Sequence, residues 1–235
     1  MRIGGYQKTS LIDYPGKVAA VIFTSGCNFR CPYCHNRDLV LARPEDGFFE
    51  VSEVLKDLEE RKNLIEGVCI TGGEPTLQKD LLEFIKKIKG LGLLVKLDTN
   101  GSNASALCSA VVNGLVDFVA LDVKAPLDHR YARSVGLEKF DVFFILSSMK
   151  ELISSGIDFE LRTTVVPTLH SEKDLLDLAK QLSEIAPKAK WVLQNFRPKN
   201  CLDPEFEKIK PYDKIFLGNL VEKLRVHMPN IKLRE

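Results

Sequence analysis

The chain has 235 residues, of which 45% are hydrophobic and 28% charged, as in an ordinary globular protein that can bury a sizeable core. Its 33 basic and 32 acidic residues leave a net charge of +1, which gives no general attraction for nucleic acid or an anionic membrane. No apolar run approaches the ~20 residues of a membrane helix, and the first residues lack the apolar core of a signal peptide, so we expect a cytosolic protein.

Short apolar segments alternate with longer amphipathic ones along the chain. The apolar segments have the length and β-branched content of strands, and they cover residues 18–23, 67–71, 93–97, 117–121, 159–166 and 191–194. The amphipathic segments are typical of helices, and they cover residues 51–62, 80–91, 104–112, 149–155, 172–185 and 212–227. Ser171 and Asp174 predict a capping box at the start of the fifth helix.

Six strand–helix pairs in succession predict a parallel sheet with helices packed outside it. The periodicity is compatible with an open, doubly wound sheet and with a partial barrel. No linker or internal repeat interrupts the chain, so we expect a single domain over residues 1–235. Its core would span about 17–198, followed by a loop and a last helix in 199–235.

Polar motifs follow directly after five of the predicted strands. A cysteine group comes after the first strand, and the others are Gly-Gly-Glu-Pro at 72–75, Asp-Thr-Asn-Gly at 98–101, Asp-Val-Lys at 122–124 and Asn-Phe-Arg-Pro at 195–198. In parallel α/β folds the active site gathers at the carboxyl ends of the strands. The sequence therefore predicts that these five motifs meet at one edge of the sheet.

Three of the six cysteines, Cys27, Cys31 and Cys34, lie within eight positions in the spacing C-x-x-x-C-x-x-C. Grouped cytosolic cysteines are typical of metal ligands. Electron-transfer clusters use four cysteines, so three thiolates predict an iron–sulfur cluster with one iron open to another ligand. Two alternatives remain open: a zinc knot completed by His35, which is crowded against Cys34, and a thioredoxin-like pair of Cys31 and Cys34, which leaves Cys27 without a role.

The remaining motifs also permit plain structural interpretations. Gly-Gly and Asn-Gly are turn formers, and Asp122 with Lys124 would suit a solvated pair at a strand end. Glu74 can instead accept hydrogen bonds from an ammonium group, and Lys124 can neutralise a carboxylate. Their predicted position at one edge favours a binding site. For the isolated cysteines we expect packing at Cys69 and Cys108, and exposure at Cys201 in the proline-flanked loop.

The cysteine spacing, with an aromatic residue before the third cysteine, resembles the radical S-adenosylmethionine (SAM) superfamily. The resemblance implies a partial (β/α)6 TIM-like barrel, a [4Fe–4S] cluster on Cys27, Cys31 and Cys34, and SAM bound to the open iron. Reductive cleavage of SAM would give a 5′-deoxyadenosyl radical that abstracts a hydrogen atom, with no catalytic side chain beyond the two cofactors.

Within the superfamily, the motifs in their order resemble the glycyl-radical-enzyme activating enzymes. The segment Ser-Leu-Ile-Asp-Tyr-Pro-Gly-Lys at 10–17 resembles the branch that activates anaerobic ribonucleoside-triphosphate reductase. The resemblance implies a set of residues around SAM: Tyr33, Asn36, Gly72, Gly73, Glu74, Asp98, Thr99, Asp122, Lys124, Arg162 and Thr164. Tyr33 would lie against the adenine, and Gly73 and Glu74 would hold the methionine amino group.

The partners implied are a glycyl radical enzyme and a reduced flavodoxin or ferredoxin as electron donor. In one place the sequence departs from the activating enzymes, because the segment 194–197 lacks the histidine that several of them carry, and Asn195 is a substitute candidate. Two other functions stay open. One is a small-molecule radical SAM enzyme such as a 7-carboxy-7-deazaguanine synthase, although His35 stands where that group has an acidic residue. The other is a non-enzymatic iron–sulfur carrier.

Overall fold

The computed structural model describes residues 1–43 and 47–234. Within them, eight strands form one sheet in which spatial order follows chain order. The strands are β1 (Ile3–Ser10), β2 (Ala19–Thr24), β3 (Gly67–Gly72), β4 (Leu94–Thr99), β5 (Phe118–Asp122), β6 (Asp158–Val165), β7 (Lys190–Asn195) and β8 (Ile231–Arg234). Because each strand pairs with its neighbours in the chain and the two ends of the order do not pair, the sheet stays open between β1 and β8.

The six predicted strands correspond to β2–β7, which pair in parallel and confirm the partial (β/α)6 barrel. Two edge strands lie outside the prediction. β1 pairs antiparallel with β2 and is largely exposed, so it lacks the apolar run of a core strand. β8 has only four residues and pairs in parallel with β7. The sheet therefore extends beyond the predicted core of 17–198 at both edges.

The helices that the sequence predicts are all present. The described helices are α1 (Arg37–Leu41), α2 (Val51–Arg61), α3 (Leu81–Gly90), α4 (Ala104–Val112), α5 (Arg130–Ser134), α6 (Phe143–Ser155), α7 (Glu172–Ile185) and α8 (Lys214–Arg225). The capping box at the start of α7 is confirmed by reciprocal bonds between Ser171 and Asp174. None of the described helices has the length and apolar character needed to cross a membrane.

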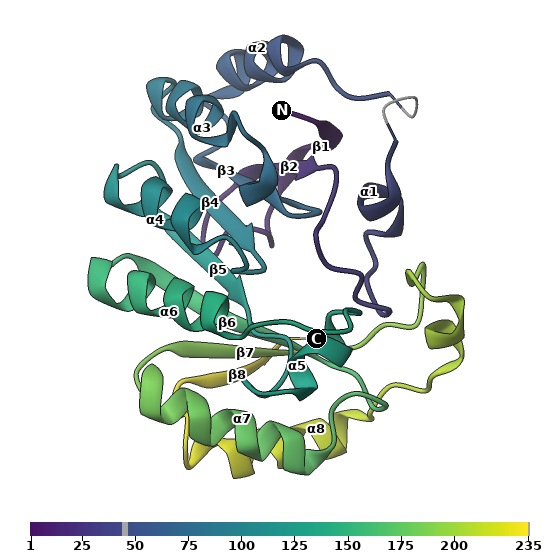
Figure 1. Cartoon of the computed structure of the whole chain (residues 1–235). Coiled ribbons are helices and arrows are strands. Elements are labelled where there is room, and N and C mark those ends of the chain that lie inside the picture. The colour runs from purple at the N-terminus through teal and green to yellow at the C-terminus, as the bar shows by residue number, and fades with distance from the viewer. Residues whose placement is uncertain (44–46, 235) are drawn as a thin grey trace.

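The helices cover the outer face of the curved sheet, and their apolar stripes form the core against it (Figure 1). On α7, for example, Leu175, Leu178 and Leu182 are completely buried at the spacing of one helical face. Two short helices, α1 and α5, follow strand ends, and α1 lies across the sheet from α3, α4 and α6 (Figure 1). Because the helices cover the outer face, the loops that follow the strands are available to form a site at the carboxyl edge of the sheet.

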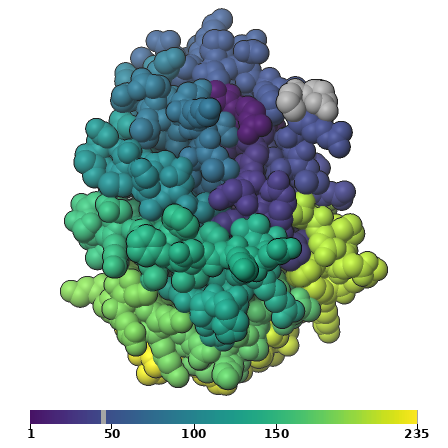
Figure 2. Space-filling view, viewed as in Figure 1, coloured from purple at the N-terminus to yellow at the C-terminus, as the bar shows by residue number. Residues whose placement is uncertain are grey.

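The segment after β7 folds back onto the cysteine loop that follows β2. The Leu202 N–H donates to the carbonyl oxygen of Cys34 at 3.0 Å, and the Asp203 N–H donates to that of Pro32 at 2.9 Å. Figure 2 shows these two distant parts of the chain, purple-blue and yellow-green, in contact on one face. The expected exposure of Cys201 is wrong, because this packing buries its side chain completely.

Candidate functional site

The three grouped cysteines line one cavity of about 220 Å³, which we call the cysteine cavity. Their loop is held in place by hydrogen bonds that run within it and to its neighbours. The Cys34 N–H donates to the carbonyl oxygen of Cys31 at 3.0 Å, and the Arg30 N–H donates to that of Val135 at 2.8 Å. Phe29 packs edge-on against Phe140 with ring centroids 5.1 Å apart. The loop is thus anchored through its backbone, which leaves the thiols to face the cavity.

Metal binding would change the protonation of these thiols. Burial raises the pKa of Cys31 to about 12 and also raises the pKa of Cys27. Thiolates are the form that binds metal, so iron binding here releases protons and affinity depends on pH. In the described residues no three His, Cys, Asp or Glu side chains are placed to hold a single metal ion. A cubane cluster differs from a single ion because each thiolate binds its own iron.

Gly72 and Gly73 are required by the fold at the point where β3 meets the cysteine loop. Gly72 has a φ of +113°, and a Cβ there would lie 2.5 Å from the backbone nitrogen of Thr24. A Cβ on Gly73 would lie 2.1 Å from the carbonyl oxygen of Gly26. The sequence suggested that these glycines make room for a ligand. The structure shows that they also make room for the backbone that carries Cys27.

Glu74 joins the β3 end to the β4 end. Its side chain is fully buried, and Oε1 accepts from Thr76 and from the Thr99 hydroxyl at 2.7 Å. Oε2 accepts one hydrogen bond, from the Asn100 N–H at 2.7 Å. Burial raises the pKa of Glu74, and these hydrogen bonds oppose the shift. Because Oε2 has a single partner, it keeps the capacity to accept from an ammonium group.

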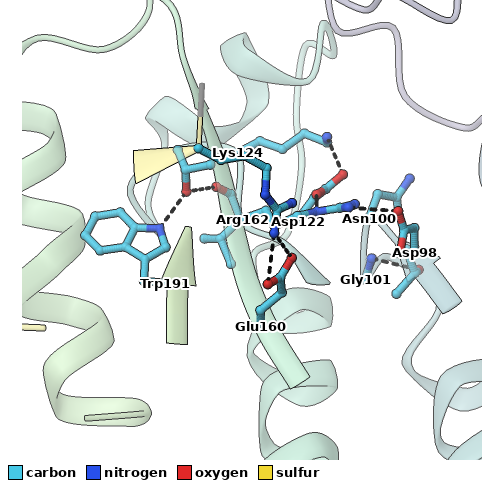
Figure 3. A network of polar contacts seen from close by, with 12 residues as sticks. Asp98, Asn100, Gly101, Asp122, Lys124, Glu160, Arg162 and Trp191 are labelled. Atoms are coloured by element: carbon cyan, nitrogen blue, oxygen red, sulfur yellow. Dashed lines mark hydrogen bonds and ion pairs between the residues drawn. The ribbon is translucent and has the colours of Figure 1, made fainter. Parts of the chain in front are cut away.

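A chain of alternating charges crosses the wall of the cavity opposite the cysteines. Arg162 Nη1 lies 2.8 Å from Asp98, its Nε lies 2.9 Å from Asp122, and Lys124 Nζ lies 3.1 Å from Asp122. Lys96 also pairs with Asp98. Figure 3 shows Arg162 beside the two carboxylates and Lys124 directed at Asp122. The alternative of a solvated pair at Asp122 and Lys124 does not hold, because both belong to a half-buried network.

The network fixes the ionisation of its members. Burial raises the pKa of Asp98, but Arg162 and Lys96 outweigh it and lower the pKa to about 2. Burial lowers the pKa of Lys124, and the Asp122 carboxylate outweighs this and holds the pKa well above its usual value. Asp98 and Asp122 are therefore charged at neutral pH, and Lys124 and Arg162 are protonated. Such a wall suits a ligand that carries both ammonium and carboxylate groups.

Thirteen of the fourteen residues predicted for the site line the cysteine cavity: Cys27, Cys31, Cys34, Asn36, Gly72, Gly73, Glu74, Asp98, Thr99, Asp122, Lys124, Arg162 and Thr164. The Asn36 amide donates to the carbonyl oxygen of Gly72 at 2.8 Å. The fourteenth residue, Tyr33, is buried beside the cavity without lining it, and its hydroxyl has no hydrogen-bond partner among the described residues. Four of the five motifs thus converge on this cavity, as the strand pattern indicates, and the fifth contributes Asn195 and Arg197 to a neighbouring cavity.

A second cavity of about 310 Å³ adjoins the first, and we call it the lateral cavity. Its walls come from both edges of the sheet and from the strands between them: Ile12, Asp13, Pro15, His35, Lys96, Asp98, Glu160, Arg162, Thr164, Gln194, Asn195, Arg197 and Arg234. The loop after β1 contributes its first members and β8 contributes the last. The lateral cavity therefore lies at the gap between the two edges of the open sheet.

Sequence reasoning missed several polar residues inside the barrel. Lys96 and Glu160 are buried on the same strands as Asp98 and Arg162, two positions earlier in each case. Because side chains two apart share a face of a strand, this spacing was the available signal. His170 has no partner spacing in the sequence, which favours a structural or solvated residue, and it is structural: its Nδ1 accepts from the Val166 N–H at 3.0 Å and its Nε2 faces the Lys124 carbonyl oxygen at 2.7 Å. No spacing pattern indicates these two contacts.

Comparisons with known proteins agree with this geometry. The model of the radical SAM superfamily matches residues 21–182. The chain is 34% identical, over 99% of its length and 95% of the relative's, to a Methanocaldococcus jannaschii protein provisionally named a glycyl-radical enzyme activating enzyme. It is 32% identical to the pyruvate formate-lyase-activating enzyme of Clostridium pasteurianum, over 74% of this chain and 72% of that enzyme.

Among solved structures, Streptococcus suis SuiB bound to S-adenosylmethionine superposes with a TM-score of 0.68 over 92% of this chain and 50% of SuiB. At 19% identity this likeness concerns the fold alone, and the chain spans about half the length of SuiB. The chain belongs to the radical SAM superfamily. It is a radical SAM enzyme, and the cofactors of its family are a [4Fe–4S] cluster and SAM. The cysteine cavity fits them, since three thiols face a wall of paired carboxylates and cations.

Proposed function

We propose that this enzyme generates a glycyl radical on a partner enzyme, and that the partner is anaerobic ribonucleoside-triphosphate reductase. The observation that carries the proposal is the lateral cavity, which joins the cysteine cavity and reaches the gap between β1 and β8. A polypeptide loop can enter an open barrel from the side. The names of the relatives, with activating enzymes among the most similar, support the same class of reaction.

The charges of the lateral cavity favour a neutral polar substrate over an anionic one. Glu160 is paired with Lys190 at 2.8 Å and with Arg234 at 2.8 Å. Lys96 and Arg162 are both paired with Asp98. An anionic substrate at these strands would have to break one of the pairs, and leaving a buried charge unpaired is costly. Among the described residues of the wall, Arg197 offers an unpaired cation, but it is exposed at the outer side. A peptide backbone needs only hydrogen bonds.

Exposed apolar residues lie beside this opening. Leu11 and Ile12, in the loop after β1, are 74% and 85% exposed, and Ile12 is part of the cavity wall. Exposed aliphatic side chains at the mouth of a site are typical of contacts with another protein. They belong to the segment 10–17 that resembles the reductase-activating branch, which supports the reductase as partner.

In this proposal Cys27, Cys31 and Cys34 bind three irons of the cluster, and SAM occupies the rest of the cysteine cavity. Bound there, the two cofactors supply the 5′-deoxyadenosyl radical that removes a hydrogen atom. Gly73 and Glu74 hold the methionine amino group, supported by Gly72, while Asn36, Lys124, Arg162 and Thr164 hold the remaining polar groups. The methionine carboxylate of SAM is placed with the help of Asp98, Thr99 and Asp122, which hold the neighbouring cationic side chains in position. Tyr33 packs towards the adenine. The electron donor is a reduced flavodoxin or ferredoxin.

Electron paramagnetic resonance tests the proposal. The cluster-loaded enzyme is incubated anaerobically with SAM, dithionite and the anaerobic reductase encoded in the same genome. A doublet from a glycyl radical on the reductase is the expected result, and it should disappear when SAM is omitted. If 5′-deoxyadenosine forms but neither the reductase nor any other glycyl radical protein of that genome gives a doublet, a small-molecule substrate replaces the protein partner.

A further inference from the structure

The junction between the cysteine cavity and the lateral cavity is the place where cofactor and substrate must meet. Four residues line both cavities, and they are Asp98, Arg162, Thr164 and Gln194. Asp98 and Arg162 are committed to ion pairs with each other and with Lys96 and Asp122. Their polar atoms therefore have little capacity left for a neutral substrate.

Gln194 is different because its side-chain amide has no hydrogen-bond partner within residues 1–43 and 47–234. It lies on β7, beside Thr164 of β6 on one side and beside Arg234 of β8 on the other. The rigid sheet therefore fixes its Cα at the junction. Gln194 is partly exposed and lines both cavities, so its uncommitted amide is accessible to a group that enters them.

The chemistry of this amide matches that of a peptide unit. A glutamine side chain presents two N–H donors and a carbonyl acceptor, the same kinds of group that a backbone peptide offers in return. A glycine segment that enters the lateral cavity buries its peptide groups, and each must find a partner there. The Thr164 hydroxyl, which we place near SAM, can also donate and accept, but it has one donor and lacks the planar geometry of an amide.

Asn195, the next residue on β7, does not offer an accessible amide. Its Nδ2 donates to the carbonyl oxygen of Tyr212 at 2.9 Å, which fixes the orientation of the amide, and its Oδ1 is buried without a partner. Asn195 lines the lateral cavity but not the cysteine cavity. Its predicted role as a substitute for the missing histidine stays a prediction.

We propose that Gln194 is a positioning residue that binds the backbone of the partner's glycine segment and holds the glycine Cα towards the cofactor. This inference rests on the proposed function. Gln194 is suited to the task because its strand places it where the two cavities join. Its amide is also the neutral group there that offers two N–H donors together with a carbonyl acceptor.

The test compares wild-type enzyme with Gln194→Met, which keeps the length of the side chain and removes its hydrogen bonds. The matched control is Gln7→Met, since Gln7 is exposed on β1. Cluster-loaded proteins are assayed with the anaerobic reductase for its KM, for SAM affinity, and for 5′-deoxyadenosine produced per glycyl radical. If Gln194→Met loads less iron than wild type, Gln194→Ala takes its place.

We expect Gln194→Met to bind SAM within about twofold of wild type, and to show about a tenfold rise in KM or in 5′-deoxyadenosine per radical, as the loss of one buried hydrogen bond predicts. Wild-type values for both would overturn the proposal, as would a tenfold loss of SAM affinity, which would make Gln194 a cofactor contact. If wild-type enzyme itself forms no glycyl radical, the proposed function fails, and this role fails with it.

Discussion

At the scale of single residues, Glu74 makes contacts that its sequence motif does not predict. Its sequence context predicted a ligand for an ammonium group, and the structure adds four hydrogen bonds, two from Thr76 nearby and two from Thr99 and Asn100 that tie the β3 end to the β4 end. Residue type and spacing identified the carboxylate. They could not identify its partners, because Thr99 and Asn100 lie 25 and 26 positions away and are brought close only by strand pairing.

His170 makes the stability of the fold depend on pH. Burial lowers its pKa to about 4, whereas an unfolded chain has a histidine pKa of about 6.5. Between these values the unfolded chain binds a proton that the folded protein does not. The free energy of unfolding therefore keeps the full contribution of His170 above pH 6.5 and loses it as the pH falls to 4, by at most about 1.4 kcal/mol per pH unit.

Substitution of His170 tests this dependence. In cluster-free protein, His170→Gln should be less stable than wild type at pH 7 and should flatten the decline in thermal midpoint between pH 6.5 and 4.5. His129→Gln is the matched control, because His129 is 90% exposed and should leave the curve unchanged. A wild-type slope in His170→Gln would show that other groups cause the decline.

At the scale of elements, the parallel strands could be predicted and the edges could not. β2–β7 carry the apolar runs that buried strands need, so the pattern located them within a residue or two at each end. β1 contains Gly4, Gly5 and polar residues on an exposed edge, and β8 is too short for any period to show. Their positions depend on the neighbouring strand, which the sequence does not reveal.

The contact between β3 and the cysteine loop yields a test at this scale. Gly73→Ala would place a Cβ 2.1 Å from the Gly26 carbonyl oxygen, so the backbone just before Cys27 must move. We expect less than half of the wild-type iron and sulfide after anaerobic reconstitution, while the circular dichroism of the fold persists.

Gly90→Ala is the control for this change, because a Cβ at the end of α3 meets nothing within 4 Å. It should load a full cluster and gain up to about 1 kcal/mol of stability from better helix propensity. If Gly73→Ala also loads a full cluster, the close approach of β3 does not determine the position of the cysteine loop.

At the scale of the whole molecule, the open sheet relates the fold to the reaction. The charges of the two cavities are balanced within the chain, and the gap between β1 and β8 gives the cofactor site a second approach. The motifs predicted the residues that gather in the cysteine cavity almost completely because they are local in sequence. The lateral cavity could not be predicted in this way, since it is assembled from a loop after β1, the interiors of β4 and β6, and the last strand.

The central claim is that the enzyme removes a hydrogen atom from a glycine of its partner, and an isotope label on that glycine tests it most directly. Anaerobic ribonucleoside-triphosphate reductase labelled with α,α-dideuterated glycine is incubated with the cluster-loaded enzyme, SAM and reductant, and the 5′-deoxyadenosine is analysed by mass spectrometry. We predict one deuterium in the 5′-deoxyadenosine, together with a glycyl radical signal whose doublet splitting collapses. Unlabelled 5′-deoxyadenosine beside an unactivated reductase would contradict the account.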